Sequence, residues 1–97
     1  MRNGEVRTVN GAWSEEQCAW VSETITLTGD CYLEVTFSGK GRMVIKKAET
    51  ENGPYPKALI TKWGGPKFKI RIIGTTEARY IRIYLTSNPV SIEISNV

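Results

Sequence analysis

The chain has 97 residues, a mass of 10.9 kDa and a formal net charge of +3, with 40% hydrophobic and 24% charged residues. This length suits one domain with one hydrophobic core, and the composition excludes a disordered chain and a membrane-spanning chain. Ile, Val and Thr together number 27, against 4 Leu and 5 Ala. Because β-branched side chains lose χ1 freedom in helices and pack well on sheets, we expect residues 1–97 to form a single all-β domain.

The first half of the chain alternates between short strand patterns and turns. Asn10-Gly11 is a strong turn signal, and residues 13–20 are the one stretch that suits a helical turn, with Ser14 and Gln17 as a capping box. Apolar and polar side chains alternate elsewhere, which is typical of strands with one buried face. The strands predicted in this half cover residues 6–9, 22–28, 31–37 and 42–47.

The second half begins with an irregular segment. Residues 49–57 contain Asn52-Gly53-Pro54-Tyr55-Pro56, and two prolines with a glycine argue against a strand there. Four further strands are predicted at 58–63, 67–73, 79–85 and 90–94. About eight short strands, each with one apolar and one polar face, predict a compact antiparallel two-sheet β-sandwich of the jelly-roll type.

The last third of the chain carries a resemblance to a known fold family. Arg79-Tyr80-Ile81-Arg82-Ile83 followed by Ser91-Ile92-Glu93-Ile94 resembles the closing strands of galactose-binding-like jelly rolls, which include many non-catalytic carbohydrate-binding modules. The resemblance covers less than a third of the chain. It implies a topology and carries over no ligand residue, and the structural calcium of some such folds has no matching carboxylate cluster here.

The sequence argues against an enzyme. It contains no histidine, which removes the commonest general base and the usual nitrogen ligand of zinc, and we expect no metal or cofactor. Cys18 and Cys31 are either small buried side chains or a disulfide that closes a loop of about a dozen residues. Met1 is followed by polar residues without a signal peptide, and no apolar run could span a membrane, so cytoplasmic synthesis and no membrane partner are expected.

The positive charge lies in the second half of the chain. Residues 57–82 hold seven basic residues and one acidic residue, Glu77. If strands 67–73 and 79–85 pair as a hairpin, one exposed face carries Lys67, Lys69, Arg71, Tyr80, Arg82 and Tyr84. Such a face suits an acidic protein surface, a glycan or a phosphate backbone. The alternatives are a solvated face whose basic side chains cover the tyrosines, or a jelly roll that puts the two strands in opposite sheets.

The aromatic residues divide into two groups. Trp13 and Trp20 are expected in the core or as a lid over it. Trp63, Tyr55 and Tyr32 are candidates for stacking on a sugar, because exposed rings beside loops suit that role.

These observations favour a non-catalytic structural or interaction protein. We expect an accessory component of a larger assembly, such as a capsid-decorating or tail protein of a phage particle, that docks on an acidic neighbouring subunit and forms a homo-oligomer or joins an assembly. Such a protein would be found in the virion. A carbohydrate-binding module is the first alternative, and a protein that binds single-stranded nucleic acid is the second.

Overall fold

The secondary structure consists of β-strands. The computed structural model describes residues 6–27, 29–37, 39–48, 50–55, 57–72 and 80–96, and this part of the chain contains ten strands and no helix. The strands are β1 (Val6–Thr8), β2 (Gly11–Ser14), β3 (Ala19–Ser22), β4 (Ile25–Thr26), β5 (Cys31–Thr36), β6 (Gly41–Ala48), β7 (Lys57–Gly64), β8 (Lys67–Ile72), β9 (Tyr80–Leu85) and β10 (Ser91–Asn96).

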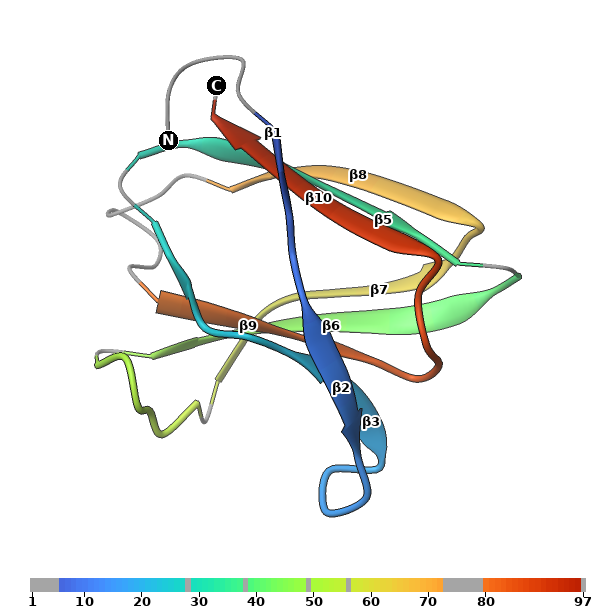
Figure 1. Ribbon diagram of the computed structural model, residues 1–97, viewed down its shortest axis with the longest axis horizontal. Coiled ribbons are helices and arrows are strands. Elements are labelled where there is room, and N and C mark those ends of the chain that lie inside the picture. Colours follow the sequence, from blue (N-terminus) through green and yellow to red (C-terminus); the bar gives the residue numbers. More distant parts are fainter. Residues whose placement is uncertain are drawn as a thin grey trace.

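The strands form two antiparallel sheets that lie face to face (Figure 1). Sheet A has the order β1-β10-β5-β8, and sheet B has the order β2-β3-β9-β6-β7, with β4 also paired to β9. When β2 to β4 are counted as one position, successive strands alternate between the sheets except at β6 and β7, which are neighbours in sheet B. The predicted compact antiparallel two-sheet β-sandwich is therefore confirmed.

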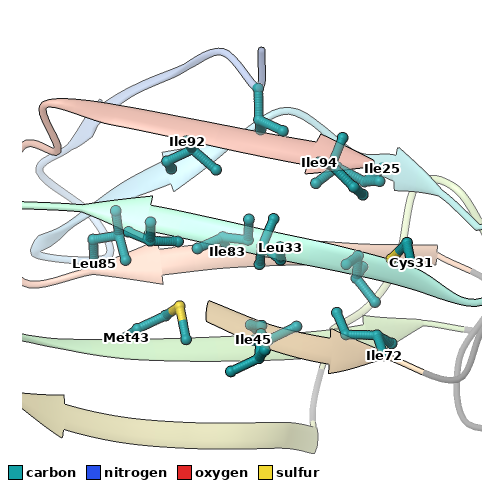
Figure 2. Close-up of a cluster of buried hydrophobic side chains, with 14 of the residues drawn as sticks. Ile25, Cys31, Leu33, Met43, Ile45, Ile72, Ile83, Leu85, Ile92 and Ile94 are labelled. Atoms are coloured by element: carbon teal, nitrogen blue, oxygen red, sulfur yellow. The ribbon is translucent and has the colours of Figure 1, made fainter. Parts of the chain in front are cut away.

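The core lies between the sheets and follows from period-two alternation. In β5, Leu33 and Val35 are fully buried while Tyr32 points outward, and in β9 Ile81 and Ile83 are fully buried. Figure 2 shows inward side chains of both sheets, among them Leu33 and Ile83, in one buried cluster. Burying each such side chain stabilises the fold by roughly 1.5–3 kcal/mol, which makes this layer the main source of stability.

A buried serine bridges the interruption between β3 and β4. Ser22 Oγ accepts a hydrogen bond of 2.9 Å from the Ile83 amide and donates one of 2.8 Å to the Glu23 carbonyl. The Glu23 carboxylate in turn accepts 2.8 Å from the Asn10 amide and pairs with Arg7 at 3.3 Å. The Ser22 hydroxyl thus replaces a backbone acceptor for the Ile83 amide. The Glu23 carboxylate connects the corner between β1 and β2 to sheet B.

The corner between β7 and β8 depends on glycine. Gly64 and Gly65 have φ values of +139° and +132°, a region that other residues rarely adopt. A Cβ on Gly65 would lie 2.6 Å from the Gly39 carbonyl oxygen, so a side chain is excluded there on steric grounds as well. This corner carries the chain from the edge of sheet B to the edge of sheet A.

Two local predictions are wrong. Residues 13–20 form most of the β2–β3 hairpin and contain no helical turn, although the Gln17 amide does donate to Ser14 Oγ at 3.2 Å. Gly11 begins β2 and lies outside any turn. Trp20 on β3 packs into the core at 7% exposure, and this burial outweighs the local capping preference.

Candidate functional site

The predicted basic and aromatic face is divided between the two sheets. Strand β8 pairs with β5 in sheet A, whereas β9 pairs with β6 in sheet B, so β8 and β9 do not form a hairpin. The condition for one six-residue face is therefore not met, and the alternative that puts the two strands in opposite sheets is the one the structure shows. Sheet A carries Lys67, Lys69 and Arg71, and sheet B carries Tyr80, Arg82 and Tyr84. Glu77 and Arg79 lie outside the described residues.

Two of the three basic residues of β8 form ion pairs with carboxylates on or just before β5. Lys67 Nζ lies 3.3 Å from Glu34 Oε1, and Arg71 Nη2 lies 2.8 Å from Asp30 Oδ2. The hydrogen bond and the negative charge of Asp30 raise the pKa of the Arg71 guanidinium. The outer face of sheet A therefore offers little net positive charge to a partner.

Lys69, the third basic residue of β8, contacts an aromatic ring of the same sheet. Its Nζ lies 5.5 Å from the centre of the Tyr32 ring. This is a cation–π contact at an exposed site, where such contacts contribute roughly 0.5–1 kcal/mol. Tyr32 is therefore part of the charged face of sheet A.

The basic residues of sheet B contact aromatic rings and hydroxyl groups. Arg82 Nε donates to Thr24 Oγ1 at 3.0 Å, and its guanidinium carbon lies 4.7 Å from the centre of the Tyr55 ring. Lys46 Nζ lies 4.7 Å from the centre of the Tyr84 ring. Lys46 and Arg82 are directly opposite each other across the β6–β9 pairing, and both are half-buried. We call Lys46, Arg82, Tyr55, Tyr84 and Thr24 the sheet B cluster.

The segment that follows β6 positions the Tyr55 ring. The Tyr55 hydroxyl donates to the Glu51 carbonyl at 2.7 Å and lies 3.2 Å from Thr24 Oγ1. Thr50 closes the turn, since its hydroxyl donates to the Gly53 carbonyl at 2.7 Å and its own carbonyl accepts from the Gly53 amide at 3.0 Å. These bonds hold the ring against the guanidinium of Arg82, so the orientation of that guanidinium is set in advance.

The two cations of the sheet B cluster, Lys46 and Arg82, differ from those of β8 in their surroundings. Among the described residues, no carboxylate forms an ion pair with Lys46 or Arg82. The terminal guanidinium nitrogens of Arg82 also have no hydrogen-bond acceptor in that part of the chain. A half-buried cation is less screened than an exposed one, so an incoming anion gains more here than at β8.

The three candidate sugar-stacking rings do not form one platform. Tyr32 lies on the outer face of sheet A, and Tyr55 packs on Arg82 at sheet B. Trp63 is 69% exposed on the edge strand β7, where it is directly opposite Arg42. The three rings therefore lie apart, and Trp63 is the most exposed of them.

The two cysteines are not bonded to each other. Cys18 is exposed in the β2–β3 turn, and Cys31 is buried at the start of β5. Cys31 is paired with Ile72 at one end of sheet A. The β2–β3 hairpin, which holds Cys18, pairs with β9 at Leu85. The two thiols therefore lie at opposite ends of the sandwich. Burial and the charge of Asp30 raise the pKa of the Cys31 thiol to about 11.

Two members of the sheet B cluster, Lys46 and Thr24, were not among the predicted site residues. The alternation of Met43 and Ile45 with Val44 already indicates that Lys46 points outward. Which strand lies beside β9 depends on a pairing between distant segments, so local alternation cannot place Lys46 next to Arg82.

The described part of the chain holds no group of three or more His, Cys, Asp or Glu side chains that could bind a metal ion. Nor does any helix there have the length and hydropathy needed to cross a membrane. Comparison of the chain with protein-family models, curated proteins and solved structures found no match. The resemblance to galactose-binding-like jelly rolls thus stays a prediction.

Proposed function

We propose that this chain is a non-catalytic docking domain that binds an acidic protein surface through the outer face of sheet B. The observation that carries the proposal is the pair of half-buried cations, Lys46 and Arg82, that no described carboxylate neutralises. A partner carboxylate at Arg82 would replace water on the guanidinium and could bind in a bidentate manner.

The state of the aromatic rings favours a protein partner over a glycan or a nucleic acid. One face of Tyr55 is taken by Arg82 and one face of Tyr84 by Lys46, so each ring has lost a stacking surface. Recognition of single-stranded nucleic acid relies on open rings along a groove with many cations. The sheet B cluster supplies two cations, which suits a small number of carboxylates.

A docking domain of this kind fits an accessory component of a larger assembly, and a phage particle is the setting we propose. The proposal of a particle rests on analogy with other small β-sandwiches. Co-sedimentation of the protein with particles from its native source tests it, and a protein that stays in the supernatant would count against it.

The docking face is tested with poly-L-glutamate as the acidic probe. The double variant Lys46→Gln/Arg82→Gln removes two partly exposed charges worth roughly 1 kcal/mol each, so its affinity should fall about 5- to 30-fold. The matched control Lys67→Gln/Lys69→Gln removes the same charge from sheet A and should change the affinity less than about twofold. Equal losses in both variants would contradict the assignment to sheet B.

Binding of polysaccharides is the competing outcome, because Trp63 is 69% exposed on the same sheet. Fluorescence titration of the wild type and Trp63→Ala with polysaccharides separates the two functions. We expect no saturable quenching. Quenching that is saturable in the wild type and lost in Trp63→Ala would favour a carbohydrate-binding module instead.

A further inference from the structure

Sheet A carries an acidic pair at its centre. Glu34 on β5 and Glu93 on β10 are directly opposite each other in the antiparallel pairing, and both lie on the outer face because their neighbours in sequence are buried. Glu34 pairs with Lys67 and lies directly opposite Lys69 on β8, whereas Glu93 is exposed and forms no ion pair with a basic residue in the described part of the chain. Like charges directly opposite across strands are destabilising, so this pair is unfavourable within one molecule.

Sheet B carries a basic pair on two of its inner strands. Lys46 on β6 and Arg82 on β9 are also directly opposite each other, and β6 and β9 are inner strands of sheet B, as β5 and β10 are of sheet A. The Cβ atoms of directly opposite residues lie about 4.5–5.5 Å apart in both cases. The two pairs therefore match in spacing and are opposite in charge.

We propose that the acidic partner is a second copy of this chain, and that the outer face of sheet A of one copy docks on the outer face of sheet B of the next. Glu34 and Glu93 of one copy would then face Lys46 and Arg82 of the other. The contact would relieve an unfavourable like-charge pair on each side. This inference rests on the proposed docking function and names the partner.

Such a contact has consequences for the assembly. It joins two different faces, so it is heterologous, and each docked pair of copies still presents one unused face of each kind at its ends. The expected products are rings or open chains of copies. A closed two-fold dimer is excluded because it would pair each face with itself.

Two charge reversals separate this contact from general effects on folding. Glu93→Lys places a cation opposite Glu34, and Lys46→Glu places an anion opposite Arg82. Each turns a like-charge pair into an opposite-charge pair within the molecule, so the urea midpoint should stay the same or rise. Each also repels the partner face, so light scattering should give the monomer mass of 10.9 kDa. A misfolded variant would show the opposite change in the urea midpoint.

The matched controls carry the same change of charge away from both pairs. Glu16→Lys in the β2–β3 turn matches Glu93→Lys, and Lys62→Glu on β7 matches Lys46→Glu. Both control variants should associate like the wild type. Loss of association in the controls as well would mean that net charge governs it, and would overturn the proposed contact.

Mixing the two reversal variants completes the test. Glu93→Lys keeps an intact sheet B and Lys46→Glu keeps an intact sheet A, so a 1:1 mixture of the two monomers should reach at least twice 10.9 kDa. A mixture that stays monomeric overturns the proposal. A wild-type protein that stays monomeric up to about 1 mM overturns the proposal as well. At that concentration only association weaker than about 4 kcal/mol would escape detection.

Binding to poly-L-glutamate, measured on the same samples, shows which proposal has failed. A monomeric wild type that binds the polymer through Lys46 and Arg82 would overturn self-association and leave the docking function supported. A monomeric wild type that does not bind the polymer would overturn both.

Discussion

A single methyl group at Gly11 should destabilise the β2–β3 hairpin. A Cβ at this position would lie 2.4 Å from the Val21 carbonyl oxygen and 2.6 Å from Cζ2 of the Trp20 indole. Trp20 is 7% exposed and cannot swing into solvent without opening the edge of the core. The backbone of β3 or the indole must therefore move to admit the methyl group.

The size of the effect follows from these distances. Comfortable contacts between heavy atoms are about 3.5–4.0 Å, so one of the groups must move by roughly 1 Å. Overpacking of this kind typically costs about 1–3 kcal/mol. Loss of glycine also lowers the entropy of the unfolded chain, which stabilises by about 0.4–1 kcal/mol where alanine fits. The free energy of unfolding of Gly11→Ala should therefore fall by about 1–2 kcal/mol.

Urea unfolding followed by tryptophan fluorescence measures this change. Gly29→Ala is the matched control, because a Cβ there would meet no atom within 4 Å and its φ lies outside the left-handed region. Gly29→Ala should be as stable as the wild type or more stable by up to about 1 kcal/mol. A Gly11→Ala protein at least as stable as the wild type would refute the packing of Gly11 against Trp20.

Three further predictions concern single side chains. Ser22→Ala leaves the buried Ile83 amide without its acceptor, so the free energy of unfolding should fall by about 1–3 kcal/mol in urea titrations, and an unchanged midpoint would contradict this role. Burial raises the pKa of the Cys31 thiol from 9.0 to about 11. The protonated thiol therefore stabilises the fold below pH 9, and this stabilisation is lost as the pH rises from 9 to about 11. Thermal unfolding should show the loss in the wild type and a smaller one in Cys31→Ala. Iodoacetamide should accordingly modify Cys18 in the native protein and spare Cys31, and equal rates at both would contradict the burial of Cys31. Trp63→Ala removes a ring that is 69% exposed and should change the free energy of unfolding by less than about 0.5 kcal/mol, whereas a larger loss would place the ring in a packing role.

The sequence was sufficient to predict the class of fold, because alternation is a local property. Leu33 and Val35 face inward and Tyr32 faces outward, as period two requires, and the same rule places Ile81 and Ile83 in the core. The alternation failed where contacts between distant segments determine where a strand begins. Val90 continues the apolar alternation of Ile92 and Ile94 but precedes β10 and is 67% exposed, because the strand begins only at Ser91.

The candidate site depended on pairings that local patterns do not encode. Residues 67–73 and 79–85 are close in sequence and suggested one basic face, yet their strands lie in opposite sheets. The ion pairs that neutralise Lys67 and Arg71 join β8 to residues more than thirty positions earlier in the chain. The contact between Arg82 and Tyr55 likewise requires the segment after β6 to fold back on sheet B. Long-range topology therefore decides which cations stay available to a partner.

The most direct test of the docking face is amide chemical-shift mapping of the isotope-labelled protein with a short glutamate-rich peptide. We expect shifts concentrated at Lys46, Arg82, Tyr84 and Tyr55, with little change along β8. Shifts centred on Lys67, Lys69 and Arg71, or no shifts at any residue, would contradict it.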